Sequence, residues 1–213
     1  MSKVCVIQPF TDDIGFYRRN GWTVSLHPEK DADLFHFCGG EDLNPSIYGQ
    51  EPIQGTHFNP HRDRIEQIAF GFALKHGIPM VGFCRGLQLI NALAGGDMYQ
   101  DVNNHAGMGK HSITIRETYE TMDVISVHHQ VVIPPDDAII LAEAEGEWTY
   151  RRYWDRQLRR ETCDENPNSN EAEIVYYPEV KGFGVQSHPE WMPSESRLVT
   201  YTWENIQKLL DMR

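Results

Sequence analysis

The sequence predicts an α/β protein with a doubly wound, mostly parallel sheet and helices on both faces. Short apolar runs typical of buried strands alternate with amphipathic helical patterns along the chain. Parallel strands that are covered on both faces have continuous apolar runs. A chain in which strands alternate with helices forms such a covered parallel sheet. With 213 residues we expect one domain, residues 1–213, that buries about 70% of its unfolded surface.

The first third of the chain predicts the first strands of this sheet. Lys3 to Pro9 is mostly apolar and fits a buried strand, and residues 12–20 fit a short helix that Gly21 closes. Residues 41–59 are interrupted by prolines and glycines, so we expect a loop there. Two further strands are expected at residues 22–27 and 33–37.

A helix–strand–helix pattern follows. Residues 63–76 have the spacing of an amphipathic helix, with a predicted apolar face of Ile65, Ile68, Ala69, Phe72 and Ala73. A strand from Ile78 leads to Cys84, and a second helix follows it until Gly95-Gly96. The apolar face of that second helix is Leu87, Ile90 and Ala94.

The rest of the chain is strand-rich and ends in a helix. Residues 111–144 show short strand-like patterns, and residues 182–188 form another apolar strand. A closing helix is expected over residues 196–212. One side of it carries Leu198, Tyr201, Asn205, Ile206 and Leu209.

An arginine-rich segment with a polar tail, at about residues 147–173, is expected to be an elaboration of the domain. Arg152, Arg156 and Arg160 are four positions apart, so a helix would align them. The tail, residues 161–173, is polar and expected to be mobile. The composition favours a solvated surface, and the alternative is a docking patch for an acidic partner or an anionic substrate group.

The charge and the cysteines limit the classes of function. A net charge of -12 argues against binding to nucleic acid or to an anionic membrane surface. The cysteines are widely spaced without a zinc-type motif, so we expect free thiols in a reducing compartment. No apolar run is long enough for a signal peptide or a membrane span, so we expect a cytoplasmic protein.

Cys84 lies in the most informative part of the sequence. Gly82 and Gly86 flank it where the predicted strand turns into the predicted helix, and such glycines allow a sharp turn. The thiol is then held at a helix N-terminus, where free amides and the helix dipole favour the thiolate. An isolated cysteine is usually apolar filler, but this context favours a nucleophile.

A thiol nucleophile needs a base and an orienting group, and His188-Pro189-Glu190 fits both roles. Residues two apart in extended backbone point the same way, so Glu190 can hold the imidazole of His188. The motif is weak by itself and becomes specific behind a glycine-rich strand and a cysteine turn. We expect the backbone amide of Arg85 and one amide of Gly39-Gly40 to donate hydrogen bonds to the oxyanion of the reaction. Two adjacent glycines can also simply form a tight turn.

With these motifs the sequence resembles the class I glutamine amidotransferase-like family, most closely its γ-glutamyl-γ-aminobutyrate hydrolase branch. Four blocks carry the resemblance, in the family's order and over most of the chain. They are Gly39-Gly40-Glu41-Asp42-Leu43-Asn44-Pro45 with Tyr48-Gly49; Arg62-Asp63 and Glu66 leading to Gly82-Phe83-Cys84-Arg85-Gly86-Leu87-Gln88 and on to Asn91, Gly95-Gly96 and Gln100-Asp101; Ser126-Val127-His128-His129-Gln130; and Gly184-Val185-Gln186-Ser187-His188-Pro189-Glu190.

The resemblance implies a flavodoxin-like fold, a catalytic triad of Cys84, His188 and Glu190, and an oxyanion hole from the amides of Gly40 and Arg85. It also implies that the substrate is held by Gly39, Gln88, His128, His129 and Gln130, with the backbone of the last three mattering most. Two adjacent histidines can indicate a metal, but no carboxylate or thiolate stands at fitting spacing. We therefore expect no metal and no cofactor.

The sequence departs from the family pattern near the expected substrate mouth. Cys38 stands where proline or serine is usual, Ser187 replaces a common tryptophan, and the arginine-rich segment replaces a short strand. The expected activity is hydrolysis of glutamine or a γ-glutamyl amine through a γ-glutamyl thioester. The alternatives are a glutaminase subunit that supplies ammonia to a separate synthetase chain, and a non-catalytic binding module. An α/β-hydrolase is disfavoured because its acid precedes its histidine.

Overall fold

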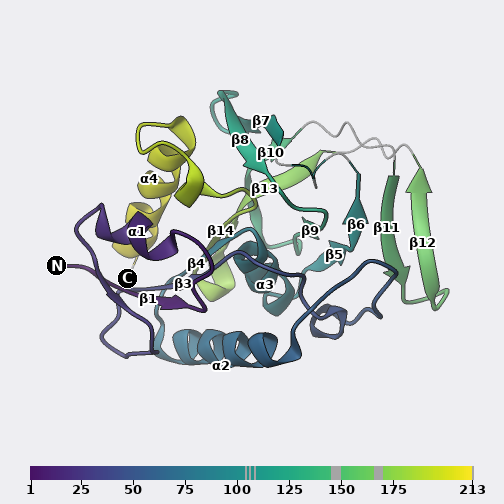
Figure 1. Ribbon diagram of the computed structural model, residues 1–213, viewed down its shortest axis with the longest axis horizontal. Helices are drawn as coiled ribbons and strands as arrows, with labels where there is room; N and C mark the ends of the chain where they lie inside the picture. Colours follow the sequence, from purple (N-terminus) through teal and green to yellow (C-terminus); the bar gives the residue numbers. More distant parts are fainter. Residues whose placement is uncertain (104, 106, 108, 145–149, 166–169, 213) are drawn as a thin grey trace.

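The structure is a computed structural model that describes residues 1–103, 105, 107, 109–144, 150–165 and 170–212. A mixed nine-stranded sheet forms its centre, in the order β2-β1-β3-β4-β14-β13-β10-β7-β8. Helices α1 and α4 cover one face, and α2 and α3 cover the other (Figure 1), so that each face has its own apolar core. This arrangement confirms the predicted α/β fold.

The sheet has a parallel half and an antiparallel half. The parallel strands are β2 (Thr23–Ser25), β1 (Lys3–Ile7), β3 (Leu34–Phe37), β4 (Met80–Phe83) and β14 (Gly182–Val185). The antiparallel strands are β13 (Glu171–Tyr177), β10 (Ile139–Ala144), β7 (Gly109–Ile115) and β8 (Thr121–Ser126). The strand-like region that begins near residue 111 therefore extends the parallel sheet at one edge.

The helices begin and end close to their predicted positions, and side chains cap two of them. Asn59 accepts bonds from the backbone amides at the start of α2, and Ser196 does the same for α4. The expected loop after Gly40 contains one short 3-10 turn, η1. The helical elements are α1 (Asp13–Arg18), η1 (Pro45–Tyr48), α2 (Pro60–His76), α3 (Arg85–Leu93), η2 (Pro178–Val180), η3 (Pro189–Trp191) and α4 (Arg197–Asp211). None of the described helices is both long enough and apolar enough to cross a membrane.

The predicted buried face of α2 is partly wrong. Ile68 was expected in the core but is 64% exposed, and Phe70 is buried in its place. The helix is rotated because its first two turns direct charged side chains inward; Arg62, Asp63 and Glu66 are all buried. A buried partner for these charges, described below, determines which face points to the sheet.

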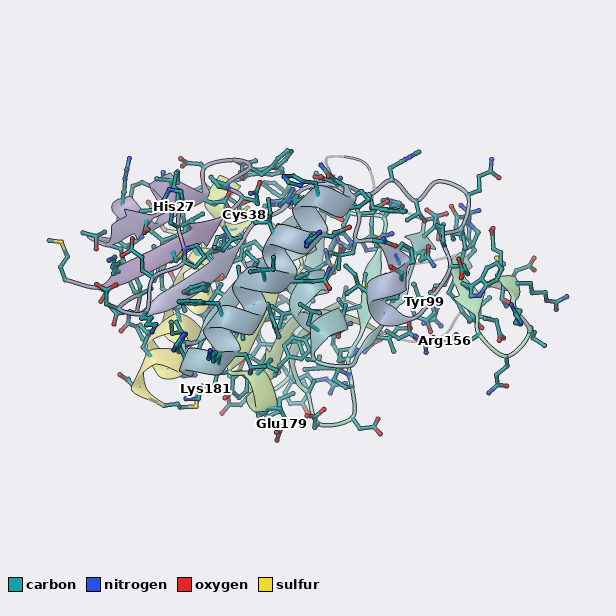
Figure 2. The ribbon with its side chains drawn as sticks, turned by 90° about the horizontal axis from the view of Figure 1, so that it is seen from below. His27, Cys38, Tyr99, Arg156, Glu179 and Lys181 are labelled. Carbon is teal, nitrogen blue, oxygen red and sulfur yellow. The ribbon has the colours of Figure 1, made fainter. Side chains whose placement is uncertain are left out.

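The arginine-rich segment forms a β-hairpin, so the prediction of a helix that would align its arginines is wrong. Strands β11 (Tyr150–Asp155) and β12 (Arg160–Glu165) pair with each other, and β11 also pairs with β6 (Asp101–Val102). Tyr99, on β5 (Asp97–Tyr99), lies at this end of the molecule, as does Arg156 (Figure 2). The last small strand, β9 (Val131–Ile133), pairs with β5.

Two of the three arginines at four-residue spacing make contacts within the chain. Arg152 forms ion pairs with Asp101 and with Glu161, and Arg156 donates to the carbonyl of Gly49 at 2.9 Å. The polar tail was expected to be mobile, but residues 161–165 belong to β12 and residues 171–173 to β13. Residues 166–169 of that tail lie outside the described residues.

The close contact between β4 and α3 predicts a stability difference between two glycine substitutions. A Cβ atom at Gly82 would lie 2.2 Å from the backbone of Gly86, whereas one at Gly71, on the exposed side of α2, would meet nothing within 4 Å. We expect Gly82→Ala to lower the free energy of unfolding by about 1–3 kcal/mol, because backbone must move. Gly71→Ala should raise it by about 0.5–1 kcal/mol. Urea denaturation measures both, and equal stabilities would contradict the packing described.

Candidate active site

Three neighbouring parallel strands bring the predicted site residues together. Strands β3, β4 and β14 lie side by side in the sheet, with Phe37 beside Gly82 and Phe83 beside Val185. The segments after their carboxyl ends carry Gly39-Gly40, Cys84 and His188 respectively. The carboxyl edge of a parallel sheet is where ligands bind in open α/β folds, so the position suits a catalytic site.

Cys84 sits in a strained turn between β4 and α3. Its φ is 49° and its ψ is -107°, a conformation that costs energy for any residue with a side chain. The turn is tight, since a Cβ atom at Gly86 would lie 2.0 Å from the carbonyl oxygen of Phe37. Cys84 is therefore fixed at the N-terminus of α3, where the helix dipole favours a negative charge on sulfur.

The imidazole of His188 joins Cys84 to Glu190. Its Nδ1 lies 2.6 Å from a carboxylate oxygen of Glu190, and the Cys84 side chain is close enough to the ring to raise the pKa of His188. Burial disfavours the imidazolium, but the hydrogen bonds to Cys84 and Glu190 outweigh burial and raise the pKa of His188 to about 10. Trp191 stacks on the ring, with centroids 3.8 Å apart. The three predicted triad residues are thus in contact.

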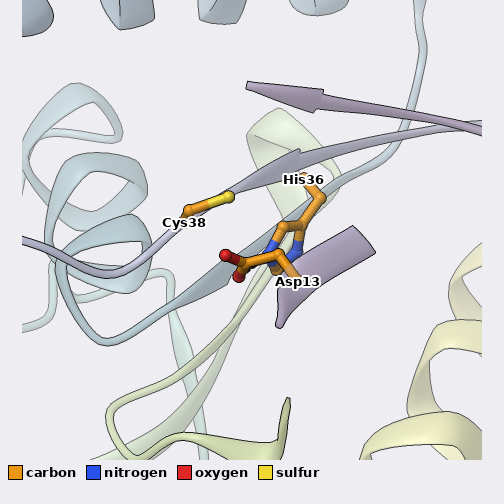
Figure 3. Close-up of side chains that lie close together, drawn as sticks. All are labelled: Asp13, His36 and Cys38. Atoms are coloured by element: carbon orange, nitrogen blue, oxygen red, sulfur yellow. Dashed lines mark hydrogen bonds and ion pairs between the residues drawn. The ribbon is translucent and has the colours of Figure 1, made fainter. Parts of the chain in front are cut away.

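A second set of buried groups supports Glu190, and the sequence analysis missed it. Thr11 donates to Glu190 at 3.1 Å, and the carboxylate of Asp13 accepts from the backbone amide of Thr11. Asp13 in turn lies 3.0 Å from Nε2 of His36, with Cys38 next to both (Figure 3). Burial favours the neutral acid, but the hydrogen bond to His36 outweighs it and lowers the pKa of Asp13. No local motif connects these residues, so only the fold reveals them.

The Gly39-Gly40 turn lies against the imidazole. A Cβ atom at Gly39 would stand 2.7 Å from Cε1 of His188, and Gly40 has a φ of 148° that favours glycine. Arg62 holds this turn by donating to the carbonyl of Gly39 at 2.7 Å. Within the described part of the chain, neither the Gly40 amide nor the Arg85 amide has a protein acceptor. Both are free to donate to a ligand.

The predicted substrate-binding residues occupy different surroundings. Gln88 donates to the backbone carbonyl of Gln130 at 3.3 Å, so the Ser126–Gln130 block does reach helix α3. His129 lies between two carboxylates, at 2.9 Å from Asp42 and 3.2 Å from Asp101. His128 points its Nε2 to another buried cluster, and burial lowers its pKa to about 4. Their roles in substrate binding stay predictions.

A family model described as Peptidase C26 matches residues 30–190, a range that contains Cys84, His188 and Glu190. The chain belongs to this family. The family is glutamine amidotransferase-like, and its relatives include hydrolases. The predicted resemblance is therefore confirmed.

Individual relatives agree with the family. A putative glutamine amidotransferase-like protein, the YvdE homologue of Lactococcus lactis subsp. cremoris, is 36% identical over 120 residues, 47% of this chain and 64% of its own length. The γ-glutamyl-γ-aminobutyrate hydrolase PuuD of Escherichia coli K12 is 22% identical over 175 residues, 78% of this chain and 66% of its own length. The chain thus matches at most about two thirds of the curated relatives' length.

A solved structure confirms the fold. The crystal structure of a glutamine amidotransferase from Thermotoga maritima superposes with a TM-score of 0.60 at 16% sequence identity. The similarity covers 99% of this chain and 89% of that chain.

The contact between Cys84 and His188 predicts a reactive thiol at position 84. A pKa of about 10 keeps His188 protonated near neutral pH, and an imidazolium beside sulfur favours the thiolate, which is the form that attacks. Glu190→Gln removes a carboxylate that raises the pKa of His188. It should therefore lower the rate of Cys84 alkylation by iodoacetamide at pH 7 about tenfold or more, because one pKa unit is a factor of ten.

Peptide mass spectrometry measures this rate and contains its own control. Cys163 is a free and exposed thiol in the same chain, so its alkylation should not respond to Glu190→Gln. A Cys84 rate that Glu190→Gln leaves unchanged would contradict the pairing of Cys84 with a protonated His188.

Proposed function

We propose that this chain hydrolyses the γ-glutamyl amide bond of glutamine or of a γ-glutamyl amine through a γ-glutamyl thioester on Cys84. The observation that supports the proposal is the contact of Cys84 with His188 and of His188 with Glu190, at the carboxyl edge of the sheet. A relative whose name specifies γ-glutamyl-γ-aminobutyrate hydrolysis supports the substrate class.

In the proposed first half-reaction, the Cys84 thiolate attacks the γ-carbonyl carbon and forms a carbon–sulfur bond. The carbonyl electrons move to oxygen, where the amides of Gly40 and Arg85 stabilise the negative charge by about 3 kcal/mol each. The His188 imidazolium then donates its proton to the nitrogen of the leaving amine, and the carbon–nitrogen bond breaks. Glutamine releases ammonia in this step, and a γ-glutamyl amine releases the amine.

In the second half-reaction, water attacks the thioester. Neutral His188 accepts a proton from the water, the carbon–sulfur bond breaks, and glutamate leaves. The thiolate and the imidazolium are restored together. Glu190 keeps Nδ1 of His188 protonated throughout, which leaves Nε2 to exchange the proton at the reacting atoms.

The second candidate is a glutaminase subunit, which the amidotransferase-like name of one relative favours. A docking patch for its synthetase was one interpretation of the arginine-rich segment. Arg152 and Arg156 instead pair with carboxylates of the same chain, which favours the hydrolase. Turnover of the isolated chain distinguishes the two, because a partner-dependent glutaminase is slow alone.

The test is a mass-spectrometric screen of the purified chain against glutamine and a panel of γ-glutamyl amines. We expect release of glutamate, and we expect the peptide that contains Cys84 to gain the mass of a γ-glutamyl group. Cys84→Ala should lower turnover by at least about a thousandfold, since it removes the nucleophile. Cys163→Ala, which changes an exposed thiol, should retain wild-type turnover. Wild-type activity in Cys84→Ala would falsify the thioester route.

A further inference from the structure

A second group of ionisable side chains lies outside the cysteine site, in the antiparallel half of the sheet. We call it the histidine–glutamate cluster, and it consists of His105, His111, His128, Glu171 and Glu173. The two glutamates are two positions apart on β13 and so face the same side, while His111 lies on β7. No carboxylate stands at fitting spacing from the adjacent histidines in the sequence, but in space Glu173 of β13 lies 3.8 Å from Nε2 of His128.

Three residues of the cluster, His105, His111 and Glu173, have ligand atoms close enough together to share one metal ion. Nε2 of His105 lies 3.2 Å from Glu171, and Nε2 of His111 and of His128 lie 3.3 Å and 3.8 Å from Glu173. Ligands at about 2.0 Å around a tetrahedral Zn²⁺ are about 3.3 Å from each other. One ligand atom from each of His105, His111 and Glu173 lies within 4.8 Å of the others.

The hydrogen bonds around the cluster turn lone pairs toward its centre. Nδ1 of His128 bonds the carbonyl of Gln130 at 3.1 Å, and Nδ1 of His105 bonds that of Asn103 at 3.0 Å. A carbonyl accepts only from a protonated nitrogen, so Nε2 of each neutral ring is left with its lone pair. Metal-binding histidines are oriented by this kind of bond.

The inward-facing atoms of the cluster are incompletely hydrogen-bonded. Among the residues that the structure describes, Nε2 of His111 and His128 and all four oxygens of Glu171 and Glu173 make no hydrogen bond of good geometry. Glu171 and Glu173 are each 1% exposed, so bulk solvent does not reach them. Buried carboxylates without donors are costly unless a cation coordinates them.

We propose that the histidine–glutamate cluster binds one Zn²⁺ ion. Imidazole nitrogen with carboxylate oxygen is a donor set that Zn²⁺ accepts, whereas Mg²⁺ and Ca²⁺ prefer oxygen alone. Glu173 supplies a negative charge, and a bound cation would also favour the ionised form of Glu171, whose pKa burial raises to about 10. The cluster is buried except for the His111 side chain, which is 21% exposed and marks the side from which an ion enters. Such a closed site is structural.

The ion would fix the segment that meets the nucleophile helix. His128 is two residues before Gln130, whose carbonyl accepts the bond from Gln88 on α3. The ion joins this segment to β7 and β13, so its removal should loosen the antiparallel half of the sheet. The inference does not depend on the proposed hydrolysis, because metal binding is measured without substrate.

The experiment titrates chelator-stripped protein with Zn²⁺ by isothermal calorimetry, in a Cys84→Ala background so that this thiol is not counted as a ligand. We expect one Zn²⁺ per chain and an increase in Tm on binding. His111→Gln and Glu173→Gln should each weaken binding by at least about tenfold. His27→Gln, which changes an exposed histidine near β2, is the matched control and should bind like the parent.

A parent protein that binds no Zn²⁺ overturns the proposal, and so does a Glu173→Gln variant that binds as the parent does. If the ligand variants fail to fold, Co²⁺ replaces Zn²⁺ in the parent protein and its visible absorption reports the ligands. Intense tetrahedral bands of nitrogen and oxygen coordination support the site. Sulfur-to-cobalt charge transfer would assign the ion to a cysteine and overturn the proposal.

Discussion

Four buried charged side chains connect the turn at Cys84 to helix α2. The guanidinium of Arg85 is 1% exposed and bonds Glu66 and, at 2.6 Å, Asp63. Arg62 also bonds Glu66, at 2.9 Å, and extends the network to the carbonyl of Gly39. Two arginines balance two carboxylates, so the group is stable as a unit, and loss of one partner leaves a buried charge that costs about 3–5 kcal/mol. The network therefore holds both the turn at Cys84 and the Gly39-Gly40 turn in place.

Buried amide side chains connect the same helix to the arginine-rich hairpin. Gln88 bonds the backbone of Gln130, whose side chain donates to the carbonyl of Gln100 at 3.3 Å. Gln100 donates to Gln50 at 2.7 Å, and Gln50 accepts from the amide of Trp154 on β11. Gln50 and Gln100 each donate and accept, whereas Oε1 of Gln130 has no hydrogen-bond partner among the described residues. The hairpin, polar in composition, is thus anchored in the interior.

Local patterns predicted the strands, the helices and the candidate catalytic residues to different degrees. Apolar runs and glycines located β1, β3, β4 and β14, because a parallel strand buried on both faces has a distinctive composition. The turn at Cys84 was recognisable because its glycines are adjacent in sequence. The inward face of α2 was not recognisable in this way, because it depends on Arg85, which lies on the next helix. The four-residue arginine spacing favoured a helix, yet pairing with β6 favoured strands.

By itself, the sequence determined the α/β class and the family and predicted the candidate nucleophile, since these depend on neighbours along the chain. Only the tertiary structure decided what surrounds them. It placed Thr11 and Asp13 behind Glu190, and it brought Glu171 and Glu173 to histidines that precede them by many residues. The physical reason is that burial of charge requires a partner, and the sheet order, not chain proximity, determines which partner is near.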